Sequence, residues 1–425
     1  MKSKAVQSLI TIILLAVFGV PIHLGAQSNY TVVTLPTLGG TAGGASSINN
    51  GGWVTGSDNL AGDNIAHATL WLRGAAHDLG TLGGPNSSVS WPVKNDRGII
   101  VGIAETTDAD PLNESWSCSA FFPSATGHIC LGFKWQNGVM KALPTLGGNN
   151  GYATAGNNRG QIVGWAENTV HDPTCVAPQV LQFRAAIWGP KDGEIQELPP
   201  LPGDTSSAAT AINDKGQAVG ISGICDVAVG RFTAKHAVLW ENGVPTDIGS
   251  LGGTSWNTPT AINNQGTVVG FSNRQGDTGG IRNYHAFIWT KDGGMHDLDT
   301  LPGDTRSAAF GINDRNQIVG LSRAPNGLIR AVLWENGAMT DLNSLVPAGS
   351  PFLLYANDIN DRGEIVGEAF DATTGNAPAF VAVPDQASAA RSSATGALRP
   401  FSKAEFPDKV RRGLSHKLGL DWDSE

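Results

Sequence analysis

The chain repeats one short phrase seven times, and this repetition limits the possible folds more than any other sequence feature. The phrase is clearest in "AINDKGQAVG", "AINNQGTVVG" and "DINDRGEIVG", which end at Gly220, Gly270 and Gly367. Its first Asn recurs every 46 to 62 residues, at Asn49, Asn95, Asn157, Asn213, Asn263, Asn313 and Asn360. Repeats of this period are typical of propellers and related arrays.

Each phrase begins with a turn. An Asn at the first position accepts a hydrogen bond from the backbone two residues on, which suits a type I turn. The fourth position must then adopt a left-handed conformation, which Gly reaches without steric cost and Asn at the lowest cost among residues with a side chain. One copy, "GINDRNQIVG", carries Asn316 there, where other copies carry Gly. We therefore interpret the phrase as a hairpin turn with a bulge rather than a Ca²⁺ loop, because "NDRN" has one acidic residue.

Two further phrases complete the unit. Sequences such as "TLGG", "SLGG" and "LPGD" precede most copies, and sequences such as "HAVLW" and "HAFIW" follow them. Each unit can thus be divided into four short strands, called a, b, c and d, of which "SAAFGIN", "QIVGLS", "HAFIW" and "GMHDLDTL" are examples. Strand a is rich in Ser and Ala, as expected for strands that crowd around a common axis.

These units predict an all-β fold, a seven-bladed β-propeller of four-stranded blades over residues 29–384. The last unit supplies only strands a, b and c, while a lone strand d, "YTVVTLPTL", begins at Tyr30 before the first unit. That N-terminal strand can complete the last blade and close the ring, which removes exposed sheet edges. A β-solenoid is the alternative, although it would require capping ends and more regular spacing.

The two ends differ from the repeats. Residues 1–26 contain Lys2 and Lys4, a 12-residue apolar run and Ala26 as a cleavage point, which is typical of a secretory signal peptide; an uncleaved anchor is the alternative. Residues 385–425 are predicted to form a flexible linker and a mixed-charge tail. After cleavage the sequence predicts no membrane span and an extracellular, secreted location, with loose association to a cell surface as a further option.

The charge balance is acidic. The formal net charge is −9, and it becomes −11 when the two lysines of the signal peptide are removed. An acidic surface repels phosphate backbones, so nucleic acid is not expected to be a partner.

The repeats resemble the extracellular HAF-repeat family, named for the tripeptide that stands here as His285-Ala286-Phe287. The resemblance rests on "HAFIW", "MHDLDTLPGD" and "GINDRNQIVG", and it covers about residues 30–382. It is loosest where Leu131, Arg184 and Pro378 replace the His. The resemblance implies a secreted bacterial repeat protein, and it implies no catalytic residues.

The repeat order sorts the connections onto two faces. The a–b and c–d turns share one face, while the b–c loops and d–a crossings share the other. The long insertions at about 105–130, 167–183, 223–235 and 273–284 lie on the b–c face, where functional loops of repeat folds tend to gather. Predicted ligand-binding residues on this face are Trp116, Phe121, Phe122 and Trp256, which offer stacking surfaces, and Asp204 and Asp304, which offer carboxylates. The alternative is that both Asp residues cap crossing turns and the aromatic residues pack under loops.

Four cysteines lie in these insertions. An even number in an exported chain predicts two disulfides, with three possible pairings. We favour Cys118–Cys130 within one insertion and Cys175–Cys225 between insertions of adjacent blades. A metal site is not expected, because no CxxC spacing is present.

The His that opens strand c is interpreted as structural. Arg184 and Arg330 occupy the same position in other copies, so the position requires a hydrogen-bond donor rather than a metal ligand. Its expected partners are the acidic residues near the end of strand d, namely Asp78, Glu197, Asp247, Asp297 and Asp341. The repeated Trp that ends strand c is expected to pack between blades.

Nucleophile elbows, phosphate loops and HExxH motifs are absent from the sequence, and no cofactor is predicted. The sequence therefore favours a non-catalytic binding module for extracellular polysaccharide or a cell-surface protein. The alternative is a glycan-degrading hydrolase or lyase, whose paired carboxylates could come from different blades.

Overall fold

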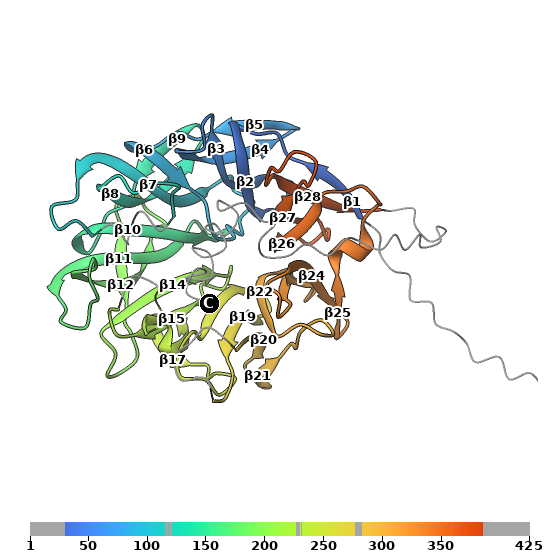
Figure 1. Cartoon of the computed structure of the whole chain (residues 1–425). Coiled ribbons are helices and arrows are strands. Elements are labelled where there is room, and N and C mark those ends of the chain that lie inside the picture. The colour runs from blue at the N-terminus through green and yellow to red at the C-terminus, as the bar shows by residue number, and fades with distance from the viewer. Residues whose placement is uncertain are drawn as a thin grey trace, which may run out of the picture.

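Seven four-stranded antiparallel sheets surround a common axis in the computed structural model, which describes residues 30–385 except 115–117, 119–120, 227–229, 231 and 277–282 (Figure 1). The predicted seven-bladed propeller is therefore confirmed. The predicted signal peptide, and the predicted tail beyond Asp385, lie outside the described residues. Among the described residues, no helix is long and apolar enough to cross a membrane.

The blades follow the chain in order, and in blades 1 to 6 the strands run outward from the axis as a, b, c and d. Blades 1 to 3 consist of β2 (Gly39–Ile48), β3 (Val54–Leu60), β4 (Ala66–Leu72) and β5 (Ala75–Asp78); β6 (Gly83–Ser88), β7 (Ile100–Ala109), β8 (His128–Gln136) and β9 (Val139–Ala142); and β10 (Gly147–Gly156), β11 (Ile162–His171), β12 (Leu181–Trp188) and β13 (Ile195–Leu198).

Blades 4 to 6 repeat this order. They consist of β14 (Ser206–Ile212), β15 (Ala218–Gly223), β16 (His236–Glu241) and β17 (Val244–Asp247); β18 (Thr258–Ile262), β19 (Val268–Asn273), β20 (Tyr284–Thr290) and β21 (Gly294–Asp297); and β22 (Arg306–Ile312), β23 (Ile318–Arg323), β24 (Ile329–Glu335) and β25 (Ala338–Asp341). Two short 3₁₀ segments, Thr233–Lys235 and Leu342–Leu345, lie in connections.

The N-terminal strand closes the ring. Blade 7 contains β26 (Phe352–Ile359), β27 (Ile365–Phe370) and β28 (Ala379–Pro384), and its outermost strand is β1 (Tyr30–Thr34). β1 pairs antiparallel with β28 from Tyr30 opposite Pro384 to Thr34 opposite Phe380. The two ends of the propeller are thus joined in one sheet, as the lone strand d predicted.

The a–b turns have the predicted geometry. In blade 6 the side-chain oxygen of Asn313 accepts hydrogen bonds from the backbone N–H groups of Arg315 and Gln317, at 3.0 and 2.9 Å. Asn316 follows with φ of 58°, and Gly216 has φ of 82° at the corresponding position of blade 4. Asn316 therefore fills a left-handed position that Gly fills elsewhere.

The Gly that ends each phrase allows strand b to pass close to strand a. A Cβ atom on Gly220 would lie 2.0 Å from the carbonyl oxygen of Ala208, and the equivalent contacts of the other six copies are 1.9 to 2.1 Å. Strand a bulges beside this Gly, between Ala209 and Ala211 in blade 4. The bulged Thr210 donates a hydrogen bond from its hydroxyl to the carbonyl of Pro259, 2.7 Å away in blade 5. A side chain is therefore excluded at this one position of strand b. The bulge in strand a links neighbouring blades.

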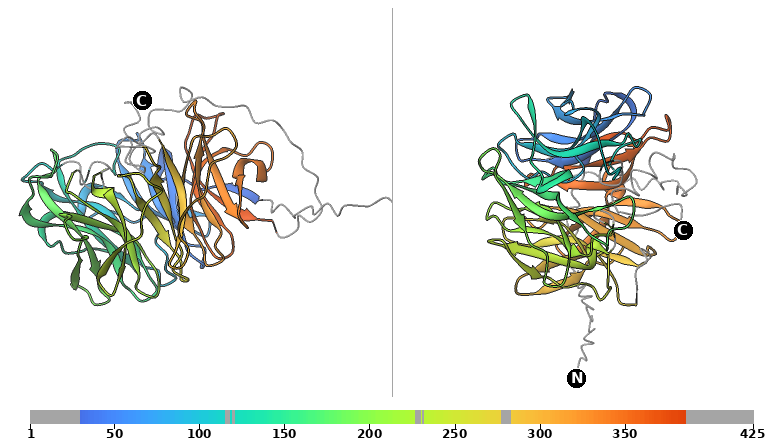
Figure 2. Two further views of the ribbon diagram at one scale, coloured as in Figure 1. Left: turned by 90° about the horizontal axis from the view of Figure 1, so that it is seen from below. Right: turned by 90° about the vertical axis from the view of Figure 1, so that its left-hand side faces the viewer.

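The core lies between the blades, which stand side by side around the ring in the two views of Figure 2. The Trp that ends strand c packs against the preceding blade, as predicted. In blade 1 the indole N–H of Trp71 donates to the carbonyl of Pro36, and in blade 4 that of Trp240 donates to Pro199, both at 2.7 Å. These bonds satisfy the polar group of an otherwise buried aromatic side chain.

Candidate ligand-binding site

A polar funnel opens on the propeller axis, at the face formed by the a–b turns. Its cavity volume is about 70 Å³, and the space counted with its open mouth is about 510 Å³. The residues that line it come from all seven blades and are Ile48, Asn49, Asn50, Lys94, Asn95, Asp96, Asn158, Ile212, Asn213, Asp214, Ile262, Asn263, Asn264, Ile312, Asn313, Asp314, Asn360 and Asp361. The funnel is therefore built by the repeated turn itself.

The first Asn of each turn connects neighbouring blades. In six blades its side-chain N–H₂ donates to the backbone carbonyl of the same Asn in the next blade, at 2.9 to 3.1 Å. The bond from Asn360 to Asn49 carries this series across the closure of the ring. Asn95 differs, because its N–H₂ donates to Ile99 within its own turn. Buried amides with satisfied hydrogen bonds hold the funnel wall in one conformation.

The second turn residue forms a closed ring at the mouth, which we call the rim. Its members are Asn50, Asp96, Asn158, Asp214, Asn264, Asp314 and Asp361. The backbone N–H of each member donates to the Oδ1 atom of the member in the next blade, and all seven bonds measure 2.8 or 2.9 Å. Every rim side chain is thereby fixed by a neighbouring backbone.

The rim contains four carboxylates and three amides. The ion pairs in the described part of the chain do not involve any of the four rim carboxylates. A basic residue follows each rim carboxylate in its turn, namely Arg97, Lys215, Arg315 and Arg362. Arg97 and Arg362 donate to backbone carbonyls of the following blade. Because carboxylates only accept hydrogen bonds, the rim presents acceptors and negative charge to the axis.

Below the rim lies the residue before the first turn Asn, and where this residue is Ile its side chain is buried between blades. Ile48, Ile212, Ile262 and Ile312 occupy the position before the first turn Asn, and Lys94 occupies it in blade 2. The Lys94 ammonium lies 2.6 Å from Asp358 Oδ1 and 2.6 Å from the carbonyl of Ile359. Burial raises the pKa of Asp358, and the Lys94 ammonium opposes that rise. One cation in the funnel is thus held by a fully buried carboxylate.

The aromatic residues predicted to form a site on the b–c face do not all lie together. Trp116 lies outside the described residues. Phe122 and Trp256 are 4% and 6% exposed, and they belong to separate apolar clusters, one under the insertions of blades 2 to 4 and the other in blades 5 to 7. Phe121 packs edge-on against Tyr152, with ring centroids 4.7 Å apart. The structure therefore brings Phe121 and Phe122 into one cluster and leaves Trp256 apart from them.

The two predicted carboxylates lie at d–a crossings and are bonded within the protein. Asp204 accepts from the hydroxyl of Ser222 at 2.7 Å, and Asp304 accepts from Ser322 at 2.6 Å. Asp304 also pairs with the Arg330 guanidinium. These contacts tie each crossing to its own blade, so ligand binding by Asp204 and Asp304 stays a prediction.

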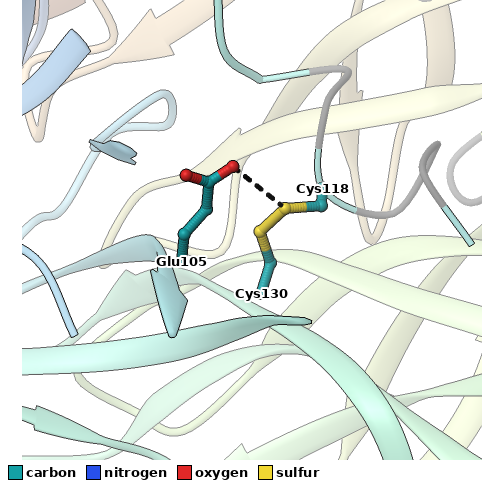
Figure 3. A group of neighbouring side chains, drawn as sticks. All are labelled: Glu105, Cys118 and Cys130. Atoms are coloured by element: carbon teal, nitrogen blue, oxygen red, sulfur yellow. Dashed lines mark hydrogen bonds between the residues drawn. A yellow bond between two sulfur atoms is a disulfide. The ribbon is translucent and has the colours of Figure 1, made fainter. Parts of the chain in front are cut away.

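Both favoured disulfides are present in the structure, and no free cysteine is found. Cys175–Cys225 joins insertions of blades 3 and 4, while Cys118–Cys130 holds one insertion against β8. The sulfur of Cys118 lies 3.8 Å from a carboxylate oxygen of the buried Glu105 (Figure 3). One disulfide therefore links the insertions of blades 3 and 4, and the other stays within blade 2.

A buried carboxylate also joins the insertions. Glu114, which is fully buried, reaches from blade 2 to accept from the backbone N–H groups of Val180 and Leu181, at 2.8 and 2.6 Å. Burial raises the pKa of Glu114, and these two amides oppose the rise. The amide of Gln179 lies 3.2 Å from Glu114 and 2.9 Å from Glu167, so it bridges two buried carboxylates. The network has the bonding of a structural link between blades.

The His or Arg that opens strand c pairs with the predicted acid in five blades. The nitrogen–oxygen distances are 2.8 Å for His67–Asp78, 3.5 Å for Arg184–Glu197, 3.0 Å for His236–Asp247, 2.9 Å for His285–Asp297 and 3.8 Å for Arg330–Asp341. Together with Asp299, His285 and Asp297 could reach one metal ion. However, Arg274 lies 3.6 Å from Asp297 and 3.4 Å from His285, and this cation disfavours a metal at that point.

Sequence reasoning missed the rim. The signal was present, because the second turn residue is Asn or Asp in all seven copies, whereas a turn alone requires neither. We had divided the connections between two faces and expected the site on the face that carries the long insertions. The short turns surround the axis, and their side chains meet only there.

The comparisons with known proteins name no activity for this chain. Residues 196–382, less than half of the chain, match a family described as "Protein of unknown function (DUF3466)". No curated protein matches the chain.

Several solved structures are similar at low identity. An acylaminoacyl peptidase from Pyrococcus horikoshii is 12% identical with a TM-score of 0.44; the match covers 78% of this chain and 49% of the peptidase, so this chain spans about half its length. An oligogalacturonate lyase in complex with manganese is 10% identical with a TM-score of 0.45, and the match covers 85% and 91% of the two chains. AofleA from Arthrobotrys oligospora is 9% identical with a TM-score of 0.35, covering 74% and 87%. These values carry no argument about ligand or activity.

Proposed function

We propose that this protein is a non-catalytic binding module that holds extracellular polysaccharide in the axial funnel. The observation that carries the proposal is the closed rim, in which seven backbone-to-side-chain bonds fix acceptor groups around one opening. A site whose polar groups are already ordered loses little entropy when a ligand binds.

The chemistry of the funnel suits a sugar. Sugar hydroxyls donate hydrogen bonds to carboxylate and amide oxygens, which the rim presents around one opening. In concave ligand sites, a small number of placed polar groups fixes the orientation of the ligand. Because the funnel lies on an axis and is bounded on all sides by turns, it admits the end of a polysaccharide chain more readily than its middle.

An extracellular setting is part of the proposal. Two disulfides tie the insertions, and disulfides persist in oxidising compartments. The predicted signal peptide and the resemblance to the extracellular HAF-repeat family support the same location. A glycan-degrading enzyme is the alternative function, and a binding experiment that also measures product separates the two.

The test is retention of the purified protein on a panel of soluble and insoluble polysaccharides, with the supernatant assayed for released sugars. The informative variant is Asp96→Asn, which removes one rim carboxylate. Asp96 Oδ1 accepts from the backbone N–H of Asn50, and an Asn can keep that bond, as the Asn residues at three other rim positions do. The variant should therefore fold, and Asp108→Asn, which removes an exposed carboxylate on β7, is the matched control.

We expect retention without sugar release, weaker retention in Asp96→Asn, and normal retention in Asp108→Asn. Retention that is unchanged in Asp96→Asn but is lost in Phe121→Ala would move the site to the b–c face. Release of sugars would favour the hydrolase or lyase, and failure to bind any polysaccharide would overturn the proposed function.

A further inference from the structure

We propose that two copies of this chain pair through the outer edge of β1, so that blade 7 of each copy joins one continuous antiparallel sheet. This surface lies on the outside of the ring, away from the axial funnel, and the proposal does not depend on the proposed function. It follows from the composition of β1, from the direction of its main-chain groups, and from the way its sequence matches itself.

β1 lacks the features that protect the other outer strands. It is the outermost strand of blade 7, and its far edge has no partner strand within the described residues (Figure 1). The outer strands of the other six blades are four residues long, and each carries a Lys, Asp or Glu. β1, with the sequence "YTVVT", is five residues long and uncharged. Short strands, charged side chains and Pro protect exposed sheet edges, because an unprotected edge pairs readily with another chain.

The open edge of β1 presents main-chain groups. The backbone N–H of Leu35 donates to the carbonyl of Ala379, next to β28, at 2.9 Å. In an antiparallel pair, successive residues direct their N–H and C=O groups to opposite sides of the strand. Val33 therefore faces β28 as Leu35 does, whereas Val32 and Thr34 direct their main-chain groups outward. These outward groups can form the ladder of one more strand.

The sequence of β1 matches itself in an antiparallel pair. A two-fold axis at Val32 places Val32 opposite Val32 of the second copy, as a pair that exchanges two hydrogen bonds. Thr31 then lies opposite Val33 of the second copy, and Val33 lies opposite its Thr31, as non-hydrogen-bonded pairs. Such a contact uses the same surface on both copies, so it closes at two chains and does not extend into a fibre. This symmetry favours a second copy as the occupant of the edge.

The side chains along the edge are compatible with this register. Val33 is 48% exposed and Val383 of β28 is 37% exposed, and the pairing of Thr31 with Val383 places them on one face of the sheet. The second copy would bring its Thr31 beside Val33, and cross-strand pairs of β-branched residues stabilise antiparallel sheets. Asp385 accepts from the Thr31 hydroxyl at 2.6 Å, but it follows β28 and lies one strand away from the new contact. The contact itself therefore contains β-branched side chains and no charge of β1.

The size of the contact determines its strength. Specific, stable interfaces bury about 1,200–2,000 Å² of surface in total, and one five-residue strand from each copy supplies less than that. We therefore expect a weak dimer whose population rises with concentration, with a Kd in the micromolar range.

The first experiment is sedimentation velocity of the full mature chain at concentrations from about 5 to about 500 µM. The key variant is Val33→Lys, which places a charge on the exposed face of β1 and leaves its main chain intact. Val244→Lys is the matched control, because Val244 is 64% exposed on β17, an outer strand that already carries Pro245 and Asp247. Both positions are exposed, so both variants should fold, and thermal unfolding of each checks this.

The second experiment tests the register. Thr31→Cys and Val33→Cys are purified separately and then mixed under mild oxidation. Residues in a non-hydrogen-bonded pair have Cα atoms about 4.5 Å apart, which is within the range of a disulfide. The mixture should therefore form covalent dimers faster than either variant alone.

We expect the dimer fraction to rise with concentration, Val33→Lys to weaken the association at least about tenfold, and Val244→Lys to leave it unchanged. Because the mature chain carries a net charge of −11, an added Lys lowers the general repulsion between copies, so weaker association in Val33→Lys reports on the edge itself. A chain that stays monomeric at every concentration would overturn the proposal, as would a dimer that Val33→Lys leaves intact. Equal cross-linking of the mixture and of the single variants would contradict pairing along β1.

Discussion

Lys94 of blade 2 and Asp358 of blade 7 form an ion pair near the axis, across the intervening blade 1, with 2.6 Å between Nζ and Oδ1. Asp358 also accepts hydrogen bonds from the hydroxyl of Ser47 and the backbone of Ile48 in blade 1, at 3.2 and 3.0 Å. One buried carboxylate therefore joins three blades at the closure of the ring.

Replacing Lys94 should destabilise the propeller. Lys94→Ile leaves Asp358 buried without a cation, and we expect the free energy of unfolding to fall by about 3–5 kcal/mol at neutral pH. The loss should be smaller in acid, because burial raises the pKa of Asp358 and protonation removes the unpaired charge. Denaturant unfolding at several pH values measures both effects. The double variant Lys94→Ile, Asp358→Ala, which restores residues found at these positions in blades 4 and 5, should recover much of the loss; no recovery would contradict the role of the pair.

Asp58 should make stability depend on pH. Its Oδ1 atom is buried and has no hydrogen-bond partner, and burial raises the pKa of Asp58 to about 6. Because the pKa of Asp58 is raised in the folded protein, its protonated form adds to the free energy of unfolding. This contribution is fully present below about pH 4 and is lost as the pH rises through about 6. We expect Asp58→Asn to gain about 1 kcal/mol relative to the wild type between pH 5 and pH 7.5. A constant difference between the two proteins across that range, measured by urea unfolding, would show that the carboxyl is not perturbed.

The Gly that ends each repeat should not tolerate a side chain. Gly220→Ala would place Cβ 2.0 Å from the carbonyl oxygen of Ala208, and we expect it to cost about 3 kcal/mol or more of stability. Gly156→Ala is the matched control, with its nearest neighbour at 3.6 Å, and should change stability by less than about 1 kcal/mol. Thermal unfolding of the two variants compares them directly, and equal effects would mean that strand a relaxes around the new methyl group.

Peptide mapping without reductant should recover Cys118 linked to Cys130 and Cys175 linked to Cys225. Removing the second bond with Cys175→Ser and Cys225→Ser should lower the free energy of unfolding by about 2–4 kcal/mol, because it closes a loop of 50 residues. Four free thiols in the oxidised, purified protein would contradict both bonds and weaken the proposed extracellular location.

Much of the fold could be predicted because its rules are local. The turn around Asn316 and the Gly at the end of each phrase are required by contacts within a few residues. The lone strand at Tyr30 has no partner in its own unit, so it predicts the closure of the ring. The His–Asp pairs could also be predicted, because His285 and Asp297 lie on neighbouring strands of one blade and recur in the same register.

The candidate site could not be predicted in this way. Trp256 was expected to offer a stacking surface, but the structure leaves it 6% exposed within an apolar cluster. Whether an aromatic residue in an insertion is buried depends on how insertions of different blades pack together, and strand periodicity carries no information about that packing.

The sequence by itself determined the repeating unit, the number of blades, the turn geometry and the closure by β1, since each follows from residues close together in one unit or from the order of units. The tertiary structure decided the rim and the Lys94–Asp358 pair. Asn50 and Asp361 are 311 residues apart in the sequence. They meet only because the seven blades form a closed ring, in which the second residue of each turn points towards the common axis. A property of the closed ring, rather than of any single repeat, therefore makes the funnel.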